Sequence, residues 1–163
     1  MTALRLYTDG SYAAPVAVSG WAWILVGEHA VASGSGATPG SSTHMAAELT
    51  AAIEGLAYLV ASGVREVELV SDSRYLVRGM SSNGRTGWAH AAAEREWRTT
   101  RGKPLLNRDL WERLLELEGC LAVTWRHVPA HRPKKDTSDE ARYNREVDAL
   151  AGEARRGFDA PRR

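Results

Sequence analysis

Hydrophobic and polar residues follow two kinds of pattern along this chain, and each pattern predicts one kind of element. Short runs rich in Val, Leu and Trp, bounded by glycines and polar turns, predict strands. Longer stretches in which apolar residues recur at helical spacing predict helices. The strands are expected over residues 3–9, 20–27, 29–35, 64–71 and 121–128. The helices are expected over residues 43–61, 73–81, 88–97, from 107 or 109 onward, and 141–156.

The order of these elements predicts an α/β fold with one mixed five-stranded sheet flanked by helices. The first three strands follow one another closely, which favours an antiparallel meander. A chain of 163 residues with 44% hydrophobic residues suits a single domain spanning residues 1–163. Residues 34–43 are rich in Gly, Ser and Pro and are expected to form a loop, and residues 158–163 to form a frayed tail.

Thr43 is expected to cap the first long helix and Gly63 to stop it. The apolar stripe of this helix is expected to contain Met45, Leu49, Ile53, Leu56 and Val60.

Composition narrows the setting in which the chain works. The single cysteine, Cys120, excludes an internal disulfide, and its apolar neighbours favour a buried structural thiol. The start of the sequence shows no basic-then-apolar leader, and no apolar run approaches membrane-spanning length. We therefore expect a cytoplasmic protein with no membrane partner, acting as a monomer.

The net charge of +1 conceals two halves of opposite sign. Residues 1–72 contain two basic and seven acidic residues, whereas residues 73–113 contain nine basic and four acidic residues. Such a division favours a metal site beside a surface that binds a polyanion. Two ordinary solvated faces would give the same counts, so charge alone does not decide between them.

Four acidic residues occupy informative positions in the predicted elements. Asp9 ends the first strand, Asp72 ends the fourth, Glu48 lies at the edge of a buried helical stripe, and Asp148 lies inside the last helix. Each has an ordinary alternative: a turn for Asp9-Gly10, a solvated boundary residue for Glu48, and a helix cap for Asp72 or its neighbour Ser71. Together they form the set of carboxylates that a two-metal nuclease needs. Carboxylates without cysteines or paired histidines favour Mg²⁺ or Mn²⁺ over zinc.

A basic stretch at about residues 82–106 is studded with tryptophans. Arg98, Arg101 and Lys103 suit contacts with phosphates, and Trp88 and Trp97 suit contacts with sugars or bases. Core packing is the alternative for both tryptophans, and we favour it for Trp111.

Four segments in order resemble the motifs of type 1 ribonuclease H, and the resemblance covers residues 3 to about 157. They are Tyr7 to Ser11, Ala46 to Leu49, Val70 to Tyr75, and Asn144 to Ala151. The resemblance implies the ribonuclease H-like fold and hydrolysis of the RNA strand of RNA–DNA hybrids, leaving 3′-hydroxyl and 5′-phosphate ends. It implies two Mg²⁺ ions, with Mn²⁺ as a substitute, held by Asp9, Glu48, Asp72 and Asp148.

The resemblance also assigns supporting roles. His131 would assist proton movement or product release, with His127 as a second candidate and a plain surface histidine as the alternative. The residues that would contact the hybrid near the metal ions are Gly10, Ser11, His44, Ser73 and Asn144. The basic stretch at about residues 82–106, the family's basic handle, would contact it through Trp88, Trp97, Arg98, Arg101 and Lys103.

The chain departs from the family at two places. His44 and Met45 stand where asparagines are common, and the segment between His131 and Asp148 is longer than usual and highly charged. Three rival functions are a DNA nuclease of the same fold, a non-catalytic hybrid-binding module, and an unrelated RNA-binding protein with a basic patch.

Overall fold

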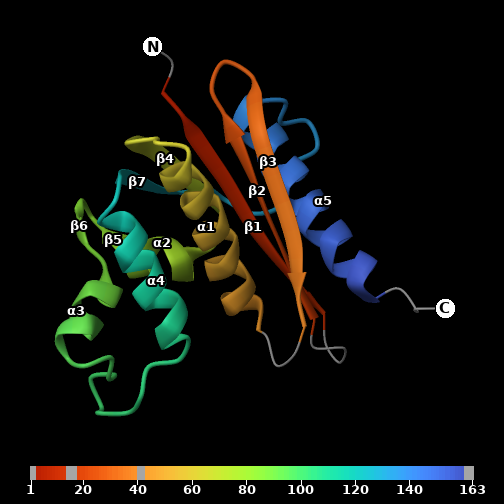
Figure 1. Cartoon of the computed structure of the whole chain (residues 1–163). Coiled ribbons are helices and arrows are strands. Elements are labelled where there is room, and N and C mark those ends of the chain that lie inside the picture. The colour runs from red at the N-terminus through yellow and green to blue at the C-terminus, as the bar shows by residue number, and fades with distance from the viewer. Residues whose placement is uncertain (1–2, 14–17, 40–42, 160–163) are drawn as a thin grey trace.

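The computed structural model describes residues 3–13, 18–39 and 43–159, and these form a sheet with helices on both faces (Figure 1). The five strands lie in the order β3-β2-β1-β4-β7. The first three strands pair antiparallel, and β4 pairs parallel with both β1 and β7. The predicted mixed sheet is therefore confirmed. The strands are β1 (Arg5–Ala13), β2 (Val18–Val26), β3 (Ala30–Thr38), β4 (Glu66–Ser71) and β7 (Ala122–His127).

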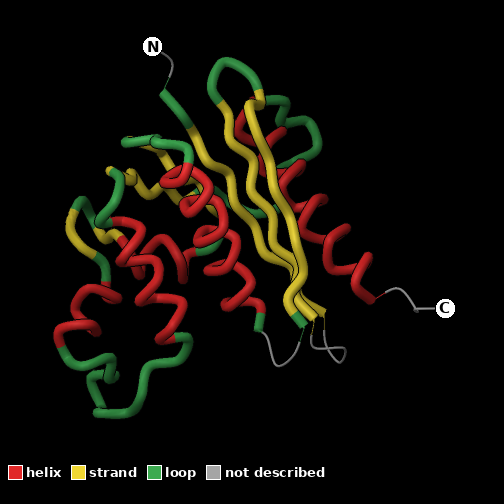
Figure 2. Tube along the Cα trace, viewed as in Figure 1, coloured by secondary structure: helices red, strands yellow, loops and turns green. Residues whose placement is uncertain are grey.

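The helices and a small hairpin fill the connections between and after these strands (Figure 2). They are α1 (His44–Ala61), α2 (Arg74–Met80), β5 (Ser81–Ser82), β6 (Arg85–Thr86), α3 (Trp88–Glu94), α4 (Arg108–Glu118) and α5 (Asp139–Asp159). Thr43 caps α1 as predicted, since its side chain accepts a hydrogen bond from the Ala46 amide at 3.0 Å. Gly63 follows the end of α1 with φ +77°, which is the conformation expected of a stop residue.

Several predicted boundaries differ from the structure. β1 continues to Ala13 and β3 to Thr38, because their pairing with β2 extends beyond the hydrophobic runs that suggested them. The loop expected over residues 34–43 is correspondingly shorter, and residues 40–42 lie outside the described part of the chain. α3 ends at Glu94, short of the predicted residue 97. α5 extends through residues 158 and 159, so these are not part of a tail, and residues 160–163 lie outside the described part.

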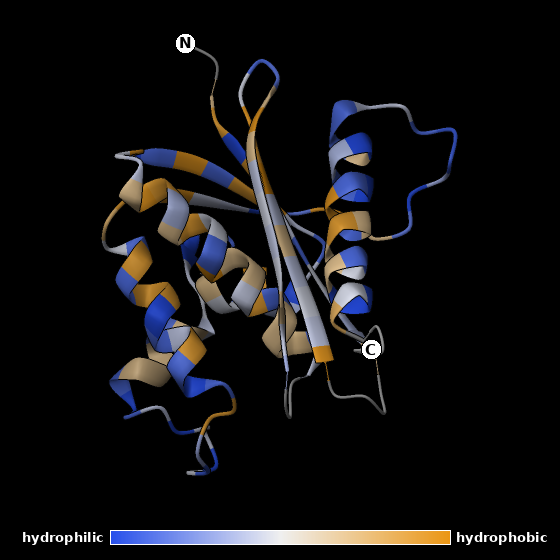
Figure 3. Ribbon diagram, turned by 45° about the vertical axis from the view of Figure 1, so that its right-hand side comes forward, coloured by the Kyte–Doolittle hydropathy of each residue, from blue (hydrophilic) through white to orange (hydrophobic). Residues whose placement is uncertain are grey.

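Two hydrophobic cores lie on opposite faces of the sheet. The larger packs α1, α2, α3 and α4 against one face, with Trp111 and Leu69 fully buried in it. The smaller packs α5 against the other face through Tyr143, Val147 and Ala151. Figure 3 shows hydrophilic and hydrophobic residues mixed along α5, as expected of a helix with only one buried side.

Two residues expected in the core are exposed instead. Met45 is 46% exposed, because it lines the mouth of two surface pockets and not the core. Cys120 is exposed because it follows the end of α4, and its thiol donates a hydrogen bond to the Glu116 carbonyl. Within the described ranges, none of the helices combines the length and apolarity that crossing a bilayer requires.

The strands β1 and β4 separate at one end of the sheet. Their parallel pairing stops at Tyr7 and Val70, whereas β1 stays paired with β2 as far as Ala13. Asp9 therefore lies within β1, not at its tip as predicted, but on the part of the strand that β4 no longer covers. Asp72 directly follows β4 at the same end.

Gly10 allows α1 to approach β1 closely at this point. A Cβ atom built on Gly10 would lie 2.5 Å from both the Ala47 carbonyl carbon and the Glu48 amide nitrogen. The Gly10 amide donates a hydrogen bond to Glu48 Oε2 at 3.2 Å. The glycine thus fixes the distance between the strand that carries Asp9 and the helix that carries Glu48.

The substitution Gly10→Ala should destabilise the protein, because α1 must move away from β1 to relieve the clash. We expect a loss of roughly 2–4 kcal/mol in the free energy of unfolding, measured by urea titration. Gly157→Ala is the matched control, since nothing lies within 4 Å of its added Cβ in α5. The control should be neutral or slightly stabilising, and equal effects of the two substitutions would contradict this packing argument.

Candidate active site

Three acidic side chains from different elements meet where β1 and β4 separate. Asp9 comes from β1, Glu48 from α1, and Asp72 from the residue after β4. One carboxylate oxygen from each lies within 4.8 Å of the others, a spacing that suits shared coordination of a metal ion. The structure thus brings together three of the four acids that the sequence analysis proposed as metal ligands.

Burial makes this convergence electrostatically costly. Asp9 is 4% exposed and Glu48 is 3% exposed. Burial and then the neighbouring Asp72 and Asp148 carboxylates raise the pKa of Asp9 from 3.8 to about 8. Burial and then Asp9 raise the pKa of Glu48 well above its usual value. A cation bound here would reverse this cost by stabilising the ionised carboxylates.

Asp72 experiences opposing influences. Burial and then Asp148 raise the pKa of Asp72, whereas the nearby His44, His127 and His131 act to lower it. Its carboxylate does not cap α2, which excludes one alternative reading of this residue. Ser73 caps that helix instead, accepting a hydrogen bond from the Leu76 amide at 3.2 Å.

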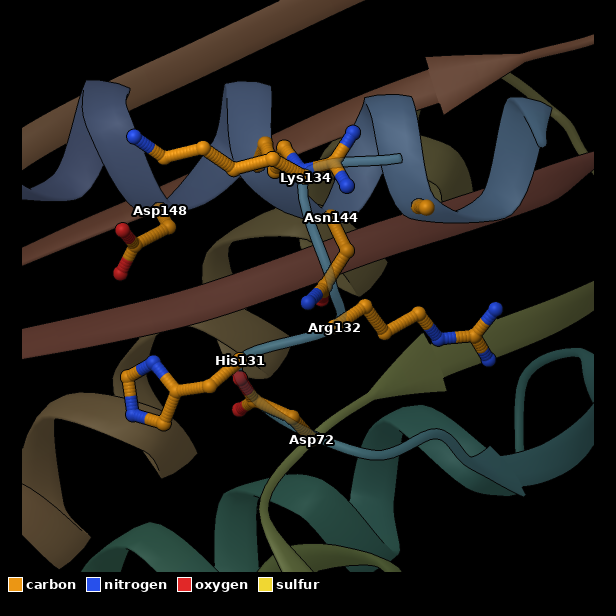
Figure 4. Close-up of a pocket in the computed structure, with 8 residues that line it drawn as sticks. Asp72, His131, Arg132, Lys134, Asn144 and Asp148 are labelled. Carbon is orange, nitrogen blue, oxygen red and sulfur yellow. The ribbon is translucent and has the colours of Figure 1, made fainter. Parts of the chain in front are cut away.

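Asp148 approaches the site from α5 on the opposite face of the sheet. It is exposed and does not belong to the group of three whose oxygens lie within 4.8 Å. It nevertheless lines the same cleft, and its carboxylate contributes to raising the pKa of both Asp9 and Asp72. Figure 4 shows Asp148 and Asn144 projecting from α5, with Asp72 and His131 on facing segments. The fourth acid is thus placed beside the other three.

A cleft of about 350 Å³ opens over these carboxylates. It is lined by the four acids and by residues of β1, α1, the start of α2 and the loop after β7. The lining residues are Asp9, Gly10, His44, Met45, Glu48, Asp72, Ser73, Arg74, Tyr75, Ala130, His131 and Asp148. His44 Nε2 lies 3.4 Å from Glu48 Oε1. The donors are carboxylate oxygens without cysteine, so the set fits hard divalent cations such as Mg²⁺.

The two candidate histidines occupy different places. His131 is exposed, lines the cleft and has a left-handed backbone with φ 55°. His127 Nε2 lies 3.3 Å from the backbone oxygen of Asp72 and is not among the residues that line the cleft. The position of His131 favours it for a role at the reacting atoms.

Other predicted contact residues are distributed unevenly. Gly10, His44 and Ser73 line the cleft, and Asn144, 9% exposed, lines a neighbouring cavity. The Ser11 hydroxyl accepts a hydrogen bond from Arg155 of α5 and lies outside the cleft lining.

The basic stretch at residues 82–106 contains β6, α3 and the loop that follows. Arg98, Arg101 and Lys103 are exposed on that loop, which the bridge between Arg98 and Pro104 closes. Trp97 is 9% exposed and packs in the larger core, so core packing explains this residue better than substrate contact. Trp88 is half-buried, and its ring is tilted against Tyr75 and edge-to-face with Trp111. It also lines an apolar pocket with Met45 and Leu106.

Sequence reasoning missed Lys134 and Arg145, which line the cavity beside Asp72 and Asp148. The only available signal was the density of charge after His131, and spacing along the chain could not show which of those charges line the cavity.

Comparison with known proteins agrees with this geometry. The family model described as RNase H matches residues 1–156. This chain belongs to the RNase H family. The enzyme assignment and the resemblance drawn from the four motifs are thereby confirmed.

Members of the RNase H family resemble this chain along most of its length. The ribonuclease H of Geotalea uraniireducens (strain Rf4) is 37% identical over 139 residues, covering 84% of this chain and 89% of that protein. The ribonuclease H of Erythrobacter litoralis (strain HTCC2594) is 35% identical over 155 residues, covering 94% and 96%.

Solved RNase H structures share the fold. RNase H1 from the halophilic archaeon Halobacterium salinarum NRC-1 superposes with a TM-score of 0.64 at 25% identity, covering 96% of this chain and 98% of that one. LC11-RNase H1, solved in complex with an RNA/DNA hybrid, gives a TM-score of 0.69 at 18% identity, covering 96% and 99%.

The raised pKa values predict how the metal-free protein responds to pH. Between about pH 4 and pH 8 the folded state holds a proton on Asp9 that the unfolded state has released, and the raised pKa of Glu48 acts in the same direction. The free energy of unfolding should therefore fall as pH rises through this window, by on the order of a few kcal/mol at about 1.4 kcal/mol per pKa unit.

Asp9→Asn should remove much of this pH dependence, as measured by urea unfolding in EDTA at pH 5 and pH 8. It should also reduce the stabilisation that Mg²⁺ gives at pH 8. Glu54→Gln, an exposed substitution on α1, is the control and should follow the unsubstituted protein. A metal-free protein more stable at pH 8 than at pH 5 would contradict the repulsion described here.

Proposed function

We propose that this protein hydrolyses the RNA strand of RNA–DNA hybrids by two-metal-ion catalysis, leaving 3′-hydroxyl and 5′-phosphate ends. The observation that carries the proposal is the convergence of Asp9, Glu48 and Asp72, two of them buried, at the base of an open cleft. Membership of the RNase H family supports it. We further propose that the protein works as a monomer in the cytoplasm, as one catalytic domain.

The four carboxylates would hold the metal ions in a divided arrangement. Asp9 is central in the group and suits a bridging ligand, with Glu48 and Asp72 completing one site and Asp148 contributing to the other. Two Mg²⁺ ions, when bound, would supply activation of a water and stabilisation of the leaving 3′-oxygen; Mn²⁺ suits the same donors.

The chain's own groups would hold the ligands and move the protons. The Gly10 amide fixes the Glu48 carboxylate through its hydrogen bond, so the ligand is oriented before any ion binds. His131 lies at the edge of the cleft and can give or take a proton near the scissile phosphate as the cleaved end departs.

Selection of RNA must depend on the 2′-hydroxyl, which DNA lacks. Glu48 and the groups beside it, Gly10, His44 and Ser73, line the cleft where that hydroxyl would lie, and Asn144 lies next to it. The exposed Arg98, Arg101 and Lys103 would bind phosphates of the DNA strand, with Trp88 beside them.

Substrate selection separates this proposal from its rivals. The protein should cleave the RNA strand of an RNA–DNA duplex in Mg²⁺ and leave matched RNA–RNA and DNA–DNA duplexes largely intact. EDTA should stop cleavage, and Asp9→Asn should lower the rate at least 10³-fold while retaining hybrid binding. Comparable cleavage of DNA–DNA would favour a DNA nuclease, and binding without cleavage would favour a non-catalytic module.

The role of His131 has its own test. His131→Ala should lower kcat roughly 10- to 100-fold with little change in hybrid affinity, since the metal ligands remain. His127→Ala tests the second candidate in the same assay. An unchanged kcat in His131→Ala with a lower kcat in His127→Ala would transfer the role to His127.

A further inference from the structure

A second cavity of about 260 Å³ adjoins the active-site cleft and shares Asp72, His131 and Asp148 with it. α5 and the segment after His131 form its walls (Figure 4). Three basic residues also line it, namely Arg132, Lys134 and Arg145, together with Ala141 and Asn144. Acidic and basic groups thus face one cavity beside the proposed metal ligands.

Ion pairs hold the segment after His131 against the sheet. Arg132 pairs with Asp136 at 3.2 Å and with Glu140, and Glu140 also pairs with Arg126 of β7. The series continues from Arg126 to Glu68 of β4 at 3.3 Å. The guanidinium of Arg132 is therefore already balanced by two carboxylates, and its task is structural.

Arg145 is also engaged in holding this segment. Its guanidinium donates a hydrogen bond to the Pro133 carbonyl at 2.7 Å, which ties α5 to the residue preceding Lys134. Asp136 fixes the far end of the segment by accepting hydrogen bonds from both the amide and the hydroxyl of Ser138. Lys134 is consequently presented from a backbone anchored on both sides.

Lys134 differs from the other two cations of the cavity. Among the residues that the structure describes, its ammonium has no ion-pair or hydrogen-bond partner. Its side chain is drawn along α5 toward Asp148 in Figure 4. Asn144, 9% exposed, lines the same cavity, and its amide has no hydrogen-bond partner within the described ranges.

We propose that Lys134 binds a phosphate of the RNA strand next to the scissile phosphate, with Asn144 as a second donor. This inference rests on the proposed function. Lys134 is exposed and lines the cavity beside Asp72 and Asp148. Once these carboxylates hold cations, they attract the ammonium less, and it is free to bind an anion. The neighbouring phosphate is the anion that the substrate itself brings. The long charged segment after His131 thereby acquires a role in positioning substrate.

The chain supplies a matched control in the next residue. Lys135 is exposed and carries the same charge, but it does not line the cavity. Lys134→Gln and Lys135→Gln would be compared with the unsubstituted parent for affinity toward a non-cleavable hybrid, by fluorescence anisotropy across a salt series in Mg²⁺. Lys134→Gln should weaken binding about three- to tenfold and reduce the slope of log K against log salt by about one. Lys135→Gln should match the parent in affinity, and its slope should change less.

Chemical removal of single phosphate charges identifies the contact. Hybrids with one neutral methylphosphonate on either side of the cleavage point would be cleaved by the wild type and by Lys134→Gln. Neutralising the contacted phosphate should raise KM for the wild type. In Lys134→Gln the same change should raise KM little further, because the interaction between the lysine and that phosphate is already lost.

Four outcomes overturn the inference. In the binding assay, they are an unchanged affinity in Lys134→Gln, or equal losses of affinity in both lysine variants. In the cleavage assays, they are additive losses in the methylphosphonate series, or an effect of Lys134→Gln only on the Mg²⁺ concentration that gives half-maximal cleavage. The last would mean that Lys134 acts on Asp148. Failure of the proposed function looks different, because the wild type would then leave the unmodified hybrid intact.

Discussion

Mutual repulsion among buried carboxylates is the constraint on which this structure depends. Asp9, Glu48 and Asp72 place oxygens within 4.8 Å of one another, and the first two are almost fully buried. The fold must therefore hold together groups that repel each other when ionised. It does so with backbone: a strand carries Asp9, a neighbouring strand ends just before Asp72, and a helix packed on that sheet carries Glu48.

The separation of β1 and β4 and the packing of α1 and α5 on the sheet set the positions of the four carboxylates. Because β4 stops pairing with β1 after Tyr7 and Val70, the sheet opens where Asp9 lies. Gly10 lets α1 approach this opening and orients Glu48 through its amide. On the other face, α5 brings Asp148, and ion pairs from Arg132 and Glu140 hold the segment that leads into that helix.

Much of this arrangement could be predicted from the sequence, for identifiable reasons. Hydrophobic periodicity indicates which segments are strands and helices, and an acid following a hydrophobic strand marks Asp72. The motif resemblance brings Asp9, Glu48, Asp72 and Asp148 into one site, and the structure places them around one cleft.

Tertiary context decided what the sequence left open. Trp97 has the character of both a core residue and a nucleic-acid contact, and only the packing of α3 and the loop after it places it in the core. Cys120 has apolar neighbours in sequence but follows the end of α4, where nothing covers it. The partners of Arg132 and the position of Lys134 beside the cavity depend on how the loop folds against α5, which charge density alone does not specify.

The central claim is that four carboxylates from separate elements hold a pair of divalent cations over the RNA strand. Anomalous diffraction from crystals of the Asp9→Asn protein, and of the unsubstituted protein with a non-cleavable hybrid, grown with Mn²⁺, tests it most directly. The account predicts two manganese peaks in the unsubstituted complex, roughly 4 Å apart and bridged by Asp9, and loss of at least one peak in the variant. Manganese bound elsewhere, or no peak between Asp9 and Asp148, would contradict it.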